Sequence, residues 1–359
     1  MKRYFKLQED EETYIPSLEE HWDRINLHLN ENFYNPPISA DFVNSLLDFK
    51  FNVYERGGAK KLKDKLAEMY DVNNENILIS NGSCEVLKHI FISIKSGSTV
   101  LLPSHTWAYY PTLVKINHLQ AVTYDLTCDD KNNVYKFDIE AIKQIITMRN
   151  PSLVLVVSPN AFTGNLISGA ELSKIAEQCG ENALLVVDQA YVEFAEDDDI
   201  IPGKFIKDYP NTVFTRTFSK FYALANTRVG YAVSGKANIA CISKYAPAFG
   251  TSGLSQRVAL EVLRCQEYYS DIKSKIADIR DRFTAGVNKL KNFKAYKSSA
   301  NYVLIKAASL DAGKIINHVM EKGIMLGDCK RYGLEHNIRV TIGEEQVMNK
   351  LLEIFTLLD

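Results

Sequence analysis

The stretch TRTFSKFYALANTRVG (residues 215–230) begins as an apolar strand and passes into a hydroxyl-rich turn that carries Lys220. Arg228 follows in the same stretch, just before Val229 and Gly230. A lysine in a partly desolvated pocket has a lowered pKa and becomes a competent nucleophile. An arginine binds phosphate through paired charge-assisted hydrogen bonds. A surface turn would have the same residues, so the interpretation depends on the sequence around it.

Upstream, ALLVVDQAY (residues 183–191) is typical of a buried strand that ends in Asp188. Because an unpaired buried carboxylate is costly, Asp188 should have a cationic partner. The protonated ring nitrogen of pyridoxal 5′-phosphate (PLP) is such a partner, and Lys220 could form a Schiff base with the PLP aldehyde. Tyr191 could reach the phenolic oxygen of the ring. The alternative role for Asp188 is a helix N-cap.

A phosphate site is indicated by SNGSC (residues 80–84), where a strand turns into a helix. Free backbone N–H groups at a helix start bind anions, and Gly82 permits close approach. An ordinary strand–helix turn explains this motif equally well. Trp107 could stack on the pyridine ring or pack in the core. Further phosphate donors would come from Thr217, Ser219 and Arg228.

The hydrophobic pattern predicts an α/β fold. Apolar strand-like runs at 76–79, 99–102, 153–157, 183–187 and 213–216 alternate with helical segments such as 84–94 and 172–179. This alternation is typical of a mainly parallel sheet covered by helices on both faces, which binds ligands at the carboxyl ends of its strands.

A second pattern begins near residue 255. It predicts one long helix at 256–290, then strands at 302–305 and 338–342 flanking a helix at 312–322. We therefore expect a large domain at 46–255 and a smaller α+β domain at 256–359 that the N-terminal segment 1–45 joins.

Composition narrows the class of protein. The 359 residues carry a formal net charge of −2 without a dominant basic block, which argues against nucleic-acid or membrane partners. The six scattered cysteines include no CxxC pair and indicate reduced thiols. An apolar leader is absent, as is any run of the ~18 apolar residues that a membrane helix needs, so a cytoplasmic protein is expected. The acidic run 196–199 is interpreted as a solvated loop, with a metal site the weaker alternative.

Together these motifs resemble the fold-type-I PLP enzymes, in particular the histidinol-phosphate aminotransferase group and the related threonine-phosphate decarboxylases. The resemblance extends from about Asn26 to the C-terminus. Its motifs are LNEN (29–32), Tyr54 before Gly57-Gly58, NGS (81–83), SPNAFTG (158–164), DQAY (188–191), SK (219–220) with Arg228, ANY (300–302) and RVTIG (339–343).

The resemblance implies a role for each matching residue. Lys220 would carry the internal aldimine and shuttle protons, Asp188 would pair with the ring nitrogen, and Tyr191 with the phenolic oxygen. Tyr54 would reach the phosphate of a neighbouring subunit, which implies a homodimer with shared sites. The other implied cofactor-binding residues are Gly82, Ser83, Cys84, Trp107, Asn160, Thr217, Ser219 and Arg228. Substrate would be held by Arg339, through its α-carboxylate, and by Asn301 and Asn32.

The chain departs from the family pattern in three motifs. Ala161 and Phe162 stand where the family has Asn-Pro, so Tyr191 would be the sole protein donor to the phenolic oxygen. Losing one such donor costs about 1–3 kcal/mol and should raise the pKa of the Schiff base. Gln189 replaces a glutamate. Gly327 replaces the arginine that helps to bind histidinol phosphate, which disfavours that substrate, although Lys330 or Arg331 could bind another anionic group.

The motifs define the cofactor better than the reaction. The leading hypothesis is an aminotransferase acting between an amino acid and a small oxo acid or oxo compound. The alternative is a decarboxylase of a small phosphorylated or acidic amino acid, because Asp328-Cys329 and the segment 332–334 resemble the decarboxylase branch. Elimination or oxidase chemistry is less favoured. A PLP-sensing transcription regulator is disfavoured because the resemblance starts too near the N-terminus.

Overall fold

The computed structural model describes residues 23–308 and 310–359, which form two sheets and the helices around them. The larger sheet has seven strands in the order β2-β10-β9-β8-β7-β3-β4. Short runs of valine, leucine and isoleucine make its centre and are buried on both faces. In this order the strands are Ile77–Ser80, Gly230–Ser234, Thr212–Thr217, Leu184–Asp188, Leu153–Val157, Thr99–Pro103 and Gln120–Tyr124.

The large sheet is parallel except at β10, which runs antiparallel to both β9 and β2. The sequence pattern did not predict β10. Because β10 is antiparallel to both of its neighbours, β2 and β9 run in the same direction, which is also that of β8 and β7. The carboxyl ends of these four strands therefore lie at one edge of the sheet. Gly230 lets β10 reach that edge, because a Cβ there would lie 2.2 Å from the backbone nitrogen of Ser83.

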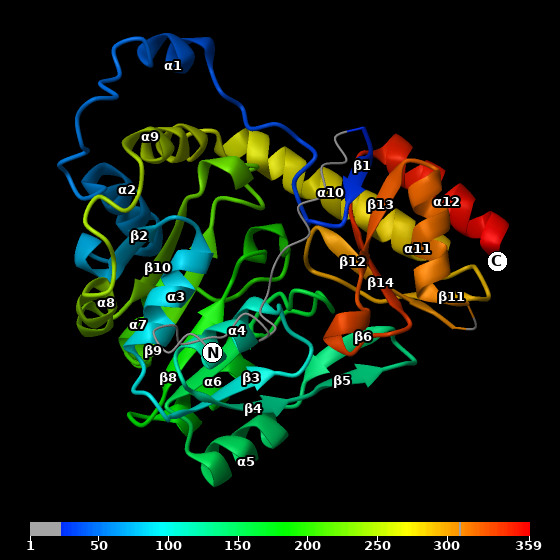
Figure 1. Ribbon diagram of the computed structural model, residues 1–359, viewed down its shortest axis with the longest axis horizontal. Coiled ribbons are helices and arrows are strands. Elements are labelled where there is room, and N and C mark those ends of the chain that lie inside the picture. The colour runs from blue at the N-terminus through cyan, green and yellow to red at the C-terminus, as the bar shows by residue number, and fades with distance from the viewer. Residues whose placement is uncertain (1–22, 309) are drawn as a thin grey trace, which may run out of the picture.

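Helices cover the large sheet. In chain order they are α2 (Lys60–Tyr70), α3 (Ser83–Ser93), α4 (Tyr109–Ile116), α5 (Ile139–Arg149), α6 (Gly169–Cys179), α7 (Pro202–Asp208), α8 (Lys236–Ser243) and α9 (Gly253–Val262). The short helix α1 (Ala40–Ser45) has no buried residue and stands away from the sheet (Figure 1). A hairpin of β5 (Leu126–Asp129) and β6 (Val134–Phe137) extends from this unit toward the small sheet (Figure 1).

The smaller sheet has five strands in the order β1-β13-β14-β12-β11. These are Ile25–Leu27, Ile324–Asp328, Asn337–Thr341, Tyr302–Ala307 and Phe293–Ala295. The early strand β1 pairs in parallel with β13, so the N-terminal segment supplies an edge of this sheet. Its helices are α10 (Gln266–Val287), α11 (Ala312–Glu321) and α12 (Glu345–Leu358).

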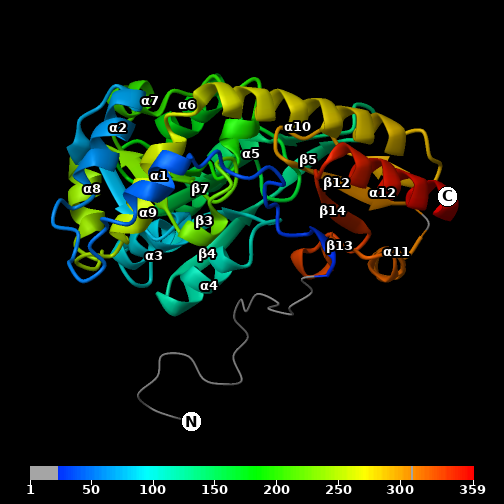
Figure 2. The same cartoon turned by 90° about the horizontal axis from the view of Figure 1, so that it is seen from above.

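The prediction of one helix at 256–290 is wrong. The chain forms α9 and α10 with a break at residues 263–265. The break allows α9 to pack on α2 beside the large sheet while α10 packs on α12 and β11. Figure 2 shows α10 extending along one side of the molecule from the large sheet to the small one. The break contains neither glycine nor proline, so the sequence had no local signal for it.

Every expected strand lies within two residues of an observed one, because continuous apolar runs are buried on both faces. Among residues 23–308 and 310–359, no helix has the length and apolarity to cross a membrane.

Candidate active site

An amine and a carboxylate meet at the shared strand edge. β8 ends at Asp188, and the neighbouring strand β9 leads into the turn that carries Lys220. The Lys220 ammonium lies 5.8 Å from the centre of the Tyr191 ring and donates a hydrogen bond of 2.7 Å to the Leu29 carbonyl. The two residues that the sequence singled out therefore occupy the same edge.

Asp188 is a buried carboxylate, with 3% of its surface exposed. Its Oδ2 accepts a hydrogen bond of 2.5 Å from the Tyr110 hydroxyl, and its Oδ1 accepts one of 3.2 Å from the Ala190 N–H. Burial raises the pKa of the Asp188 carboxyl, and the Tyr110 hydrogen bond opposes that change. A cationic ligand would relieve this burial cost.

Tyr110 was not among the predicted site residues. It lies in the first turn of α4, far from Asp188 in sequence, and no motif links the two positions. Its ring meets the edge of Trp107, with centroids 5.7 Å apart. The predicted ring-stacking residue Trp107 thus lies beside the partner of Asp188.

An anion seat forms where α3 starts. Gly82 has φ 80°, and a Cβ at this position would lie 2.7 Å from Arg228 Nη2. Arg228 donates from Nη1 to Ser219 Oγ at 3.2 Å, and the Ser219 N–H donates to Thr217 Oγ1 at 3.1 Å. Arginine, hydroxyls and a helix N-terminus thus converge as phosphate binding requires. Ser83 is the first residue of the helix and is buried.

Cys84 connects this seat with the lysine and the carboxylate. Burial raises the pKa of its thiol, while the nearby charge of Arg228 and, more weakly, that of Lys220 act to lower it. The negative charge of Asp188 acts to raise the pKa of this thiol. The charges of Arg228, Lys220 and Asp188 therefore all affect the pKa of this one half-buried cysteine.

Tyr191 has a hydrogen-bond partner that the sequence analysis missed. Asn30, with 1% of its surface exposed, donates from Nδ2 to the Tyr191 hydroxyl oxygen at 3.0 Å. Thr341 fixes the amide orientation, because its Oγ1 accepts from the Asn30 N–H at 3.0 Å and donates to Asn30 Oδ1 at 3.2 Å. The Tyr191 oxygen is thus an acceptor for Asn30, and its proton is directed elsewhere. Asn30 belongs to the LNEN motif, where Asn32 was chosen instead.

Arg339 lies on β14 of the small sheet, and its guanidinium contacts the segment that follows β7. It donates from Nη1 to the Ala161 carbonyl at 2.9 Å and from Nη2 to the His28 carbonyl at 2.8 Å. Its guanidinium carbon lies 5.2 Å from the centre of the Phe162 ring and 5.6 Å from that of Tyr302. Within the described residues, its buried Nε has no hydrogen-bond partner.

The two predicted substrate asparagines make loop contacts. Asn32 donates to the Phe221 carbonyl at 2.8 Å, next to Lys220. Asn301 donates to the Asn30 carbonyl at 3.2 Å. Both amides therefore hold the segment that carries Asn30 in place. Their hydrogen bonds go to backbone carbonyls, and nothing in their positions points to contact with a substrate.

The remaining predicted residues occupy different surroundings. Asn160 is fully buried, and its Oδ1 accepts from the N–H groups of Phe162 and Thr163. Tyr54 is 75% exposed and stacks on Phe249, with centroids 4.8 Å apart. The structure therefore does not bring Tyr54 to the anion seat of its own chain.

The segment that carries Lys330 and Arg331 covers Phe162 through Tyr332. The Tyr332 ring lies 4.4 Å from that of Phe162, centre to centre, and the Arg331 guanidinium carbon lies 5.1 Å from the Tyr332 centre. Lys330 and Arg331 are both exposed.

Comparison with known proteins places this geometry in a family. The family described as aminotransferase class I and II matches residues 23–355. The chain belongs to the class I and II aminotransferases. The histidinol-phosphate aminotransferase of Ruminiclostridium cellulolyticum is 29% identical, over 92% of this chain and 91% of its own.

Solved structures share the fold of this aminotransferase. Histidinol-phosphate aminotransferase from Sinorhizobium meliloti, in complex with PLP, has a TM-score of 0.82 at 23% identity, covering 94% of this chain and 92% of its own. L-threonine-O-3-phosphate decarboxylase from Porphyromonas gingivalis has a TM-score of 0.78 at 19% identity, covering 93% and 99%. Such distant likeness shows the fold alone.

PLP is the cofactor of this aminotransferase family, and the residues present fit it. A buried carboxylate, an amine and an anion seat lie on one sheet edge, and the missing Cβ of Gly82 leaves the Arg228 guanidinium room in that seat. The cofactor expected from the sequence is therefore confirmed.

Proposed function

We propose that this enzyme transfers an amino group between an amino acid and a small oxo acid, with Lys220 as the residue that bonds to PLP and moves the proton. The observation that carries the proposal is the meeting of Lys220, Asp188 and Arg228 at one strand edge. Bound PLP supplies an electron sink for the bonds at the amino acid's Cα.

The protein's own groups would prepare this sink in two ways. Asp188, held by Tyr110, would keep a positive charge on the ring nitrogen, because a neutral ring is a weaker sink. Tyr191 would donate its proton to the phenolic oxygen, since Asn30 already donates to the tyrosine oxygen. Because Ala161 stands in place of the usual asparagine, the Tyr191 hydroxyl would be the main protein donor that stabilises the phenolic oxygen.

Arg339 would bind the α-carboxylate of the substrate. Two of its nitrogens are fixed by backbone carbonyls, and the unpartnered Nε is a remaining donor for an anion. A charge-assisted hydrogen bond to a carboxylate is the interaction that this donor suits. Lys330 and Arg331 remain candidates for a second anionic group on the substrate.

We further propose that histidinol phosphate is not the preferred substrate, although relatives of this chain are named for it. Gly327 lies on β13 opposite Arg339, and a Cβ there would lie 3.0 Å from the Arg339 carbonyl oxygen. The arginine that the family uses for the phosphate of histidinol phosphate is thus replaced by a residue without a side chain.

We also propose a homodimer with shared active sites. Large apolar side chains are exposed along one segment and beside it: Leu47, Phe51, Val53, Tyr54 and Phe249. Exposed patches of this kind mark protein interfaces. A second copy of the chain would cover them and bring Tyr54 to the neighbouring phosphate.

The test is to incubate PLP-loaded enzyme with a panel of amino acids that includes histidinol phosphate and O-phosphothreonine. Conversion to pyridoxamine phosphate, followed by absorbance, and release of CO₂ are measured in parallel. We expect conversion without CO₂ for at least one amino acid and little reaction with histidinol phosphate. Release of CO₂ in step with substrate loss would instead identify a decarboxylase.

A further inference from the structure

A polar cavity of about 760 Å³ lies apart from the strand edge that carries Lys220. The hairpin β5–β6 and residues 164–168 form one side of it, and α10 with residues 297–299 forms the other. Lys220, Asp188, Arg228 and Arg339 are not among its described lining residues. Its volume is in the range of small-molecule sites.

Asn165 lines this cavity and carries a side-chain hydrogen-bond donor that is not used. The residue is 5% exposed, and its Oδ1 accepts from the Thr163 hydroxyl at 2.5 Å. In the described part of the chain its Nδ2 is buried without a partner. Buried polar groups are almost always hydrogen-bonded, so this N–H indicates an acceptor that binds in the cavity.

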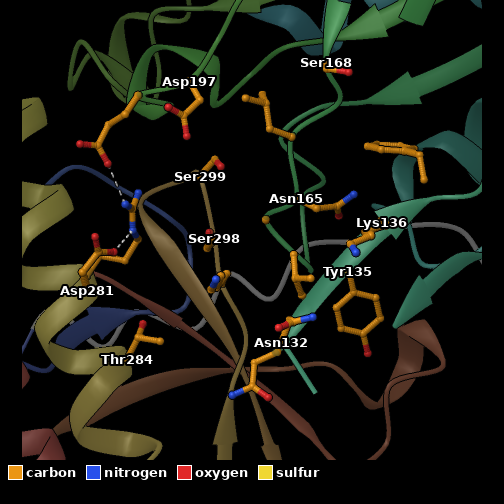
Figure 3. Close-up of a pocket in the computed structure, with 18 of the residues that line it drawn as sticks. Asn132, Tyr135, Lys136, Asn165, Ser168, Asp197, Asp281, Thr284, Ser298 and Ser299 are labelled. Carbon is orange, nitrogen blue, oxygen red and sulfur yellow. Dashed lines mark hydrogen bonds and ion pairs between the residues drawn. The ribbon is translucent and has the colours of Figure 1, made fainter. Parts of the chain in front are cut away.

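The walls of the cavity carry opposite charges. Figure 3 shows Lys136 on β6 near Asn165, with Asp197 and Asp281 across the opening. The Lys136 ammonium lies 3.2 Å from Asp129 Oδ2, and its other N–H groups can donate to a second anion. Arg280 also lines the cavity, but it is already paired, with Asp281 at 2.9 Å and Glu196 at 3.1 Å. The side of Asn165 therefore suits a carboxylate, and the side of Asp197 suits an ammonium group.

We propose that this cavity is a second ligand site that binds a free amino acid as its zwitterion. The carboxylate would accept from Asn165 Nδ2 and lie near Lys136, and the ammonium would face Asp197. An uncharged side chain would contact apolar groups that also line the cavity: Val134, Leu166 and Ala285. A dianion would be repelled by the acidic wall, and a polyamine would leave the Asn165 donor unused.

The site connects to the catalytic loop through hydrogen bonds. The Asn160 N–H donates to the Asn165 carbonyl at 3.0 Å, and the Gly164 N–H donates to the Asn160 carbonyl at 2.9 Å. The next residue, Ala161, holds Arg339 through its carbonyl. A ligand on Asn165 would therefore restrain the loop that positions Arg339.

Calorimetric titration of L-leucine tests the proposal, in holoenzyme treated with borohydride so that the cofactor cannot react. We expect saturable binding of L-leucine at one site per chain and none of N-acetyl-leucine or leucine methyl ester, which each lack one charge. Asn165→Asp keeps the shape and the acceptor for Thr163 but removes the donor, and should raise Kd about tenfold or more.

Two further variants keep the test independent of folding. Asp197 and Lys136 are exposed, so Asp197→Asn and Lys136→Ala should fold normally and also raise Kd. Asn182→Asp, an exposed position outside the cavity, is the matched control and should leave Kd unchanged. Absence of saturable binding by wild type, or a Kd in Asn165→Asp or Asp197→Asn equal to that of wild type, would overturn the proposal.

Discussion

The direction in which the Tyr191 hydroxyl donates its proton is fixed by its neighbours in this site. Asn30 donates to its oxygen, and Thr341 prevents the amide from flipping. The tyrosine proton is therefore available to another acceptor. Because Ala161 stands where the family has a second donor, we propose that Asn30 positions the Tyr191 hydroxyl toward the phenolic oxygen of PLP without itself contacting the cofactor.

Asn30→Asp should reverse the hydrogen bond between residue 30 and Tyr191, so that the tyrosine becomes the donor. A carboxylate accepts the Tyr191 proton, which withdraws it from the phenolic oxygen, and the pH at which the visible band of the bound cofactor titrates should rise by about one unit. An absorbance titration measures this. Asn32→Asp is the control, since its side chain faces the Phe221 carbonyl, and should change the titration less. Equal titrations of wild type and Asn30→Asp would contradict the role of Asn30.

Asp188→Asn separates charge from packing. The amide oxygen can still accept from Tyr110, but it cannot balance a positive ring nitrogen, so kcat should fall about a thousandfold. The apoprotein should be at least as stable as wild type, because burial disfavours the charge that the variant removes. Turnover and thermal unfolding of the apoprotein check both parts. Unchanged turnover would remove Asp188 from the mechanism.

At the level of elements, a buried ionic cluster links β9 to the segment after β8. Arg216 donates from Nε and Nη2 to Gln189 Oε1 at 3.0 and 2.8 Å, and its Nη1 lies 3.6 Å from Glu193 Oε1. Gln189 replaces the family's glutamate, and Glu193 and Asp198 supply negative charge near Arg216 instead. Burial raises the pKa of Glu193 to about 7, although Arg216 opposes this.

This pKa predicts how stability depends on pH. The value of about 7 lies above the ordinary 4.5, so the folded state binds more protons than the unfolded state between these values. The Glu193 contribution is therefore fully present below pH 4.5 and is lost as pH rises through 7. Over this window the free energy of unfolding should fall by about 1–3 kcal/mol from this group.

Glu193→Gln should flatten that dependence. Denaturant unfolding of apoprotein between pH 5 and 8 measures it, with the exposed Glu181→Gln as control. A variant whose stability falls with pH as steeply as that of wild type would show that Glu193 does not titrate in this range.

For the whole molecule, the exposed apolar segment predicts assembly. Leu47 and Phe51 are both exposed in the segment that leads to Tyr54, so a Leu47→Asp and Phe51→Asp double variant should be monomeric in size-exclusion chromatography with light scattering. It should also lose PLP affinity, because Tyr54 could no longer reach a neighbouring phosphate. Leu357→Asp, at another exposed leucine, should remain dimeric. A wild-type protein that is monomeric would contradict the shared site.

Sequence patterns predicted the sheet edge at which Lys220, Asp188 and Arg228 lie, because buried strands are continuous apolar runs and polar residues follow them directly. The roles of these residues toward the cofactor stay predictions. The patterns missed Tyr110 and Asn30, whose partners Asp188 and Tyr191 are distant in sequence and become neighbours only in the folded chain. They also missed β10, a short strand next to a glycine, and the break between α9 and α10, which tertiary packing decides. The roles of Asn32 and Asn301 in substrate binding stay predictions.

We propose that Lys220 bonds to PLP beside Asp188 and Arg228. The most direct test is borohydride reduction of the holoenzyme followed by peptide mass spectrometry. We expect one modified site per chain, on the peptide that contains Lys220, and no modification in Lys220→Ala. A label on another lysine, or a wild-type protein that takes up no PLP, would contradict it.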